Sequence, residues 1–171
     1  MKKIFLLTLI ACFLSSLGVY SQNDKSKRVS HPAKVSETIS SGATITINYS
    51  KPSAKGRFIG KEVAHFGKVW RTGANEATVF EVDKNIMVNG KKLPAGKYSL
   101  YTIPGQKAWT IIFNKTWDQW GTVYSVAEDA LRVTSKPIKT VNSTEQLTFK
   151  IAKNGLVSLL WTNTKVDFKV Q

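Results

Sequence analysis

The sequence predicts an all-β protein built as an antiparallel β-sandwich, with a barrel as second choice and a jelly-roll or immunoglobulin-like strand order left open. From residue 43 onward, short segments alternate apolar and polar residues with a period of two, as half-buried strands do. Turn-forming residues separate these segments at intervals of about 8 to 12 residues. No long amphipathic helix interrupts them, so helical and mixed fold classes are disfavoured.

The first clear strand covers residues 43–49, where Ile45, Ile47 and Tyr49 point to one face and polar residues to the other. Later segments with strand-like composition or alternation are 77–82, 85–88, 97–103, 109–113, 131–138, 147–151, 156–161 and 166–170. Asn-Gly dipeptides at residues 89–90 and 154–155 are typical of hairpin turns. The helical segment that we expect is one turn near residues 125–130.

Residues 1–21 have the layout of a secretory signal peptide. A short positive end is followed by an apolar run from Ile4 to Val19, which is shorter than the ~20 residues needed to cross a bilayer. Cleavage is predicted after Ser21, which gives a periplasmic or extracellular protein with no transmembrane segment. In the alternative, Leu9-Ile10-Ala11-Cys12 is a lipobox and Cys12 carries a lipid, but the apolar residues that follow Cys12 disfavour it.

Cysteine and histidine contents limit the chemistry of the exported part. Cys12 is the only cysteine, so removing the signal peptide leaves neither a disulfide nor a thiol nucleophile. His31 and His65 are too few for a multi-histidine metal centre. No metal site and no cofactor are therefore expected.

The protein is strongly basic, with a net charge of +14. Its 25 basic residues include Lys2 and Lys3 of the signal peptide, so 23 remain against 11 acidic residues, a net charge of +12. Such a charge favours anionic partners such as lipid headgroups or acidic glycans. No nucleic-acid partner is expected outside the cell. Because the lysines are scattered over many loops, solubility alone is an alternative explanation, and the sequence indicates no oligomeric state.

Residues 22–36 are predicted to form a flexible linker, because they are basic and polar with almost no apolar residues. The remaining residues, 37–171, are enough for one domain with a proper core and too few for two of ordinary size. One β-sandwich domain is therefore expected after the linker.

Several motifs resemble one known family. The run Trp-Arg-Thr-Gly-Ala-Asn-Glu at residues 70–76 lies within a longer matching stretch, and further matches follow in the same order at 93–100, 103–105, 109–114 and 120–121. Together they resemble the family catalogued as domain of unknown function 2911, over residues 36–171. The resemblance implies an exported protein of a Bacteroidetes-type bacterium. It carries no established activity, so no catalytic residue can be transferred.

Four polar residues, Arg57, Arg71, Asn75 and Glu76, lie among glycines in a region flanked by predicted strands. A rigid scaffold can present such loop residues together, and arginine matches carboxylate, phosphate or sulfate. They are candidates for binding an anionic or carbohydrate-like ligand. In the alternative, Arg57 or Arg71 forms a buried pair with Glu76 that holds the loop, and Asn75 caps backbone groups.

Two tryptophans, Trp117 and Trp120, lie in a predicted loop beside Asp118 and Gln119. Flat aromatic rings next to polar groups are the arrangement that a sugar platform needs. In the alternative, they plug the open end of the sandwich. Trp109 follows the alternation of its strand and is predicted to lie in the core.

An enzymatic alternative is a carboxylate-dependent hydrolase that uses Glu76. Glycosidases place two carboxyl groups about 5 to 10 Å apart, and Glu62, Glu81 and Asp83 are candidates for the second one. The spacing selects none of the three, so the sequence favours non-catalytic binding. The remaining alternative is a structural envelope protein with no small-molecule ligand.

Overall fold

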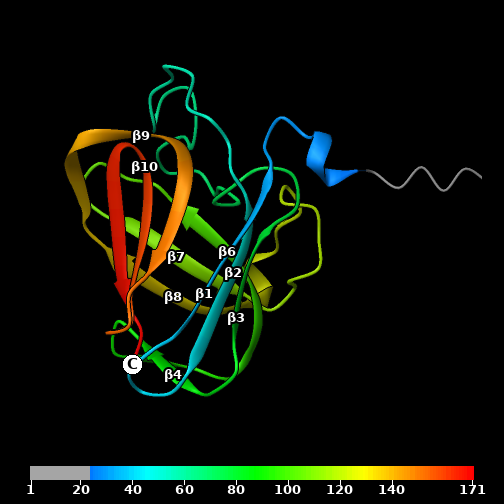
Figure 1. The fold of residues 1–171 in the computed structure, drawn as a ribbon, viewed down its shortest axis with the longest axis vertical. Helices are drawn as coiled ribbons and strands as arrows, with labels where there is room; N and C mark the ends of the chain where they lie inside the picture. Colours follow the sequence, from blue (N-terminus) through cyan, green and yellow to red (C-terminus); the bar gives the residue numbers. More distant parts are fainter. Residues whose placement is uncertain (1–23) are drawn as a thin grey trace, which may run out of the picture.

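A computed structural model describes residues 24–171, which form an all-β structure, as the sequence predicts (Figure 1). The predicted signal peptide at residues 1–21 and the alternative lipid site at Cys12 lie outside the described residues. The strands are β1 (Pro32–Thr38), β2 (Thr44–Ser50), β3 (Thr78–Val82), β4 (Ile86–Val88), β5 (Lys91–Leu93), β6 (Gly96–Ile103), β7 (Trp109–Asn114), β8 (Asp129–Ser135), β9 (Pro137–Ile151) and β10 (Leu156–Lys169).

Helical structure in the described range is limited to two short 3-10 helices, η2 (Lys25–Lys27) and η3 (Val126–Glu128). The second lies where the sequence predicts a helical turn. Within residues 24–171, no helix has the length and apolar character that crossing a membrane requires.

Six strands form one open antiparallel sheet in the order β1-β2-β3-β6-β7-β8. β4 and β5 form a small hairpin, and its turn residues Asn89 and Gly90 have positive φ angles of 46° and 79°. Asn-Gly adopts this turn geometry with little strain, which is why the dipeptide predicted the hairpin. β9 and β10 form a long hairpin that lies against one face of the large sheet (Figure 1).

The main core lies between this hairpin and the sheet, and aromatic pairs cross it. The Phe80 ring on β3 lies 5.0 Å from Phe113 on β7 and 6.2 Å from Phe168 on β10, measured between ring centroids. Tyr49 on β2 packs edge-on against Phe149 on β9 at 4.9 Å, and the Phe149 N–H donates to the Tyr49 hydroxyl. Two layers thus share one core, which confirms the predicted β-sandwich.

The residues predicted to face the core do so. Ile45 and Ile47 are fully buried, and Trp109 is 1% exposed. The last two predicted strands, 156–161 and 166–170, instead form the single strand β10, which ends at Lys169. Register shifts between Leu160 and Thr164 interrupt the pairing with β9 without ending the strand.

The outer face of the sheet is covered only in part. β6 buries residues on both faces: Leu100 packs in the main core, whereas Tyr101 packs with Ala77 and Ile112 in a second, smaller cluster. Tyr124, from the loop that connects β7 and β8, packs against this cluster. That loop, residues 115–128, therefore covers β6 and β7, while outer-face side chains of β1, β2 and β3, apart from the buried Ser50, stay exposed or half-buried.

The prediction of a flexible linker over residues 22–36 is wrong for 32–36, which belong to β1. β1 is an edge strand that pairs with β2 alone, and its residues alternate between exposed and half-buried. Because neither face of β1 is fully buried, polar residues are tolerated at most positions, and the apolar alternation that predicts a strand is weak.

Substituting Phe80→Ala is expected to lower the free energy of unfolding by about 3–5 kcal/mol, because the fully buried ring contacts both layers. Urea denaturation measures the change. Val141→Ala is the control, since Val141 is 98% exposed and its truncation should cost less than about 0.5 kcal/mol. A loss for Phe80→Ala as small as that of the control would contradict the two-layer core.

Candidate functional site

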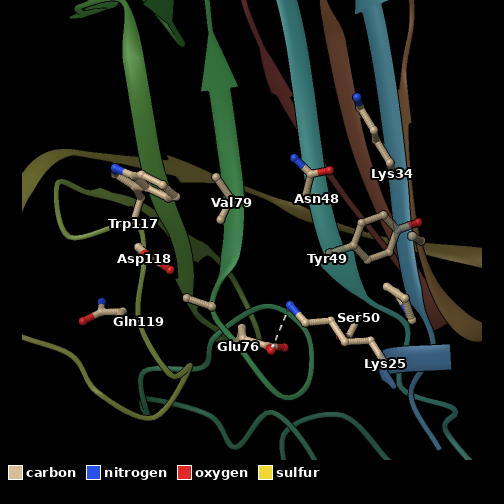
Figure 2. A pocket seen from close by; sticks show the side chains of 13 residues that line it. Lys25, Lys34, Asn48, Tyr49, Ser50, Glu76, Val79, Trp117, Asp118 and Gln119 are labelled. Atoms are coloured by element: carbon tan, nitrogen blue, oxygen red, sulfur yellow. Dashed lines mark ion pairs between the residues drawn. The ribbon is translucent and has the colours of Figure 1, made fainter. Parts of the chain in front are cut away.

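The main candidate site is an open pocket of about 420 Å³ on the outer face of the sheet, beside the 115–128 loop. Its floor is a row of cross-strand neighbours: Lys34 on β1 lies opposite Asn48 on β2, and Asn48 opposite Val79 on β3. Figure 2 shows this row, with Trp117 and Asp118 beside Val79 at one end and Lys34 at the other. We call it the Trp117 pocket.

Three polar side chains in the Trp117 pocket have no hydrogen-bonding or ionic partner within residues 24–171: Lys34, Asn48 and Asp118. They come from β1, β2 and the 115–128 loop, so they line different sides of the hollow. Gln119 also lines the pocket, but its Nε2 donates to the Tyr101 hydroxyl at 3.1 Å. The polar groups of these three side chains are thus available to bind a ligand.

Glu76 lies at the end of the Trp117 pocket and is held by the segment before β1 (Figure 2). The Nη1 of Arg28 donates to both carboxylate oxygens, at 2.8 and 2.6 Å, and Lys25 Nζ lies 3.3 Å from Oε1. The Arg28 hydrogen bonds, helped by Lys25, lower the pKa of Glu76 from 4.5 to about 2. Glu76 is therefore ionised at neutral pH with both oxygens occupied.

The alternative prediction, that Arg57 or Arg71 forms a buried pair with Glu76, is wrong. The partner is Arg28, from the segment that sequence composition assigned to a linker. Arg28 follows no periodic pattern and lies 48 residues from Glu76, so no local signal in the sequence points to the pair.

Asn75 stabilises the loop rather than facing the pocket. Its backbone is left-handed, with a φ angle of 61°, and its Nδ2 donates to the Ser30 carbonyl and to Ser50 Oγ, both at 3.2 Å. Its own carbonyl accepts from the Gly121 N–H at 3.1 Å. Asn75 therefore links the segment before β1 to the 115–128 loop. This agrees with the alternative prediction, in which Asn75 caps backbone groups.

The two loop tryptophans differ in position. Trp117 lines the pocket and is 41% exposed, and the Lys97 ammonium lies 5.0 Å from its ring centroid. Trp120 is 50% exposed and lies outside the pocket lining, although its backbone pairs with that of Glu76. Of the two tryptophans predicted to form a sugar platform, Trp117 thus lies in the pocket and Trp120 does not.

The predicted cluster of four polar residues is divided among separate places. Arg57 donates from Nε and Nη2 to the carbonyls of Ala54 and Ser53, at 2.9 and 2.8 Å, and so holds its own loop. It lines a different pocket, between residues 54–66 and the β9–β10 hairpin. Arg71 lines a third pocket on the other side of the 115–128 loop.

The carboxylates proposed as hydrolytic partners of Glu76 are engaged elsewhere. Glu62 accepts from the Phe58 N–H, Asp83 from the Thr44 N–H, and Glu81 pairs with Lys97. None of the three lines the Trp117 pocket. Among residues 24–171, no group of three or more histidine, cysteine or acidic side chains is arranged to hold a metal ion.

Replacing Glu76 with glutamine should lower the free energy of unfolding by about 1 kcal/mol at pH 7, because solvent screens a carboxylate that is 38% exposed. A lowered folded-state pKa stabilises the protein above pH 4.5, and this contribution is lost as the pH falls towards about 2. Denaturant unfolding at pH values from 7 down to about 2 measures the difference between the two proteins.

Glu81→Gln is the matched control, because its ion pair with Lys97 is 3.5 Å long with both side chains more than 40% exposed. It should change stability by less than about 0.5 kcal/mol at any of these pH values. A deficit in Glu76→Gln that persists unchanged at the lowest pH would show that the charge is not the cause.

Comparison with known proteins agrees with the motifs noted in the sequence. No similar protein was found among curated proteins or among solved structures. The pattern of the family described as "Protein of unknown function (DUF2911)" matches residues 30–170, which is more than half of the chain. The match includes all six candidate residues, from Arg57 to Trp120. The chain belongs to this family.

Proposed function

We propose that this protein is a non-catalytic binding module and that the Trp117 pocket takes a carbohydrate-like ligand. The observation that carries the proposal is that Trp117 and three polar side chains without described partners line one open pocket. A volume of about 420 Å³ lies in the range of small-molecule sites. An indole ring offers a flat apolar surface for stacking on a sugar ring.

The charges of the pocket favour a hydroxyl-rich ligand over a strongly anionic one. Lys34 donates, Asp118 accepts, and Asn48 does both, which matches hydroxyl groups that are themselves donors and acceptors. The charges of the lining residues balance, with Lys25 and Lys34 against Glu76 and Asp118, so the lining does not select a polyanion. The high net positive charge of the protein is therefore not what defines this pocket.

The state of Glu76 favours binding over hydrolysis. A general acid must carry a proton near neutral pH, and a pKa of about 2 leaves Glu76 without one. As a general base Glu76 is weak, because a carboxylate with a pKa of about 2 has little affinity for a proton and Arg28 donates to both of its oxygens. We therefore give Glu76 the role of fixing the segment before β1 at the edge of the pocket.

The proposal includes export. The signal peptide predicted at residues 1–21 would deliver the domain to the periplasm or beyond the cell, where glycans are abundant. Mass spectrometry of the protein recovered from the expressing cells would identify the new N-terminus. If Gln22 is the first residue, cleavage after Ser21 is supported. If the first residue is a lipid-modified Cys12, the protein is a lipoprotein and the prediction of cleavage after Ser21 is wrong.

Trp117→Ala is expected to weaken binding of an oligosaccharide by roughly tenfold or more, since it removes the stacking surface. The probes are uncharged oligosaccharides of glucose, galactose and N-acetylglucosamine, with binding followed by isothermal titration calorimetry. Trp120→Ala is the matched control: this tryptophan lies in the same loop, is similarly exposed and stands outside the pocket, so its loss should leave affinity unchanged.

Two outcomes would oppose this function. Flat titrations with every oligosaccharide would favour the structural envelope protein that the sequence left open. Saturable binding that survives Trp117→Ala but is lost in Trp120→Ala would move the site away from the Trp117 pocket.

A further inference from the structure

A second pocket, of about 330 Å³, surrounds Arg71 and shares no lining residue with the Trp117 pocket. Besides Arg71, its lining comprises Val69, Trp70, Tyr101, Gly121, Thr122 and Tyr124. Tyr101 and Tyr124 pack edge to face, with centroids 4.9 Å apart. Val69 is 40% exposed and Tyr124 is half-buried, so apolar surface lies open beside Arg71.

Arg71 differs from the other three arginines of the chain. Arg28 and Arg132 pair with carboxylates, and Arg57 donates to backbone carbonyls. Arg71 has no ion pair or hydrogen bond within residues 24–171, and its Nε–H is buried without an acceptor. The terminal nitrogens Nη1 and Nη2 have no partner there either, but they are not buried, so they are free to donate to an acceptor that comes from outside the chain.

The backbone around Arg71 holds the side chain in place. A Cβ atom at Gly121 would overlap Arg71 Cδ, so the glycine lets the arginine stem lie against the loop. The next residue, Thr72, is fully buried with a left-handed φ angle of 52°, which is unfavourable for a β-branched residue. Hydrogen bonds between the Thr72 hydroxyl and both Thr102 Oγ1 and the Trp70 carbonyl hold that conformation. Arg71 is thereby preorganised.

The tyrosine hydroxyls of this pocket are already satisfied. Tyr101 donates to the Val123 carbonyl at 2.7 Å and accepts from Gln119. Tyr124 bonds to Asp129 at 2.8 Å and accepts from Arg132. Tyr101 is 1% exposed, so the ring surface open to a ligand is that of the half-buried Tyr124, and the polar recognition of a ligand falls to Arg71.

We propose that Arg71 and the apolar surface beside it form a second binding site, for a small carboxylate carried on an aromatic or apolar body. The guanidinium fork matches the two oxygens of a carboxylate. The lining contains one cationic side chain and no lysine, so it balances a single negative charge rather than the two of a phosphate. Tyr124 and Val69 offer apolar surface to the body of the ligand. This site is independent of sugar binding at Trp117.

The test uses benzoate as probe, with benzamide as its uncharged isostere and inorganic phosphate as the competing anion. Calorimetric titration of the purified protein should show saturable benzoate binding, with benzamide and phosphate at least about tenfold weaker. In two-dimensional NMR of the unmodified protein, benzoate should shift the Gly121 amide and the Tyr101 and Tyr124 ring signals. This measurement needs no variant.

Arg71→Lys keeps the charge but removes the planar fork of the guanidinium, so benzoate affinity should fall by about tenfold or more. Arg57→Lys is the matched control, since Arg57 lies at another pocket, and it should bind benzoate as the unmodified protein does. The thermal unfolding midpoint of each variant checks that it is folded. If Arg71→Lys does not fold, the NMR shifts decide.

Four results would overturn the proposal: absence of saturable benzoate binding, equal affinity for benzamide, phosphate binding as tight as benzoate binding, or NMR shifts confined to other parts of the protein. Because the probes carry no sugar, a failure here leaves oligosaccharide binding at Trp117 untouched, and the reverse also holds.

Discussion

The packing of the β9–β10 hairpin against the large sheet is the interaction on which the rest of the structure depends. The chain has a single cysteine, so no intramolecular disulfide can hold the layers together, and the core must do so. The hairpin also contacts the segment that leads to Arg71: Trp161 on β10 stacks on Trp70 at a centroid distance of 5.2 Å. Trp70 in turn pairs its backbone with Thr102 on β6, which places the following residue, Arg71, beside the outer face.

The two pockets are built around one contact between loops. The Gly121 N–H donates to the Asn75 carbonyl, and the Ala77 N–H donates to the Gln119 carbonyl. The side chain of Gln119 lines the Trp117 pocket while its Nε2 donates to Tyr101, which lines the Arg71 pocket. The pockets are thus separated by a shared wall. Left-handed backbone at Asn75, at a cost of about 1–3 kcal/mol, is maintained because these hydrogen bonds require it.

The strands with one buried face were predictable because their signal is local. In β2, each residue's face follows from the pleat alone, so Ile45 and Ile47 identify the core side and Asn48 the outer side without knowledge of the partner strands. β1 shows the limit of this reasoning. It gains its stability from pairing with β2, and a strand that lies at a sheet edge needs few apolar residues, so its composition resembles that of a linker.

The sequence by itself determined the β-sandwich class, the family, and the residues from which a site can be built, because alternation, turn dipeptides and motifs are properties of neighbouring residues. Tertiary structure alone decided how these residues are grouped. Glu76 meets Arg28 across 48 positions, and Lys34 meets Asn48 through strand register. Arg71 and Glu76, only five positions apart, line different pockets. Such groupings depend on how strands pair and loops close, and both are set by contacts between residues distant in the chain.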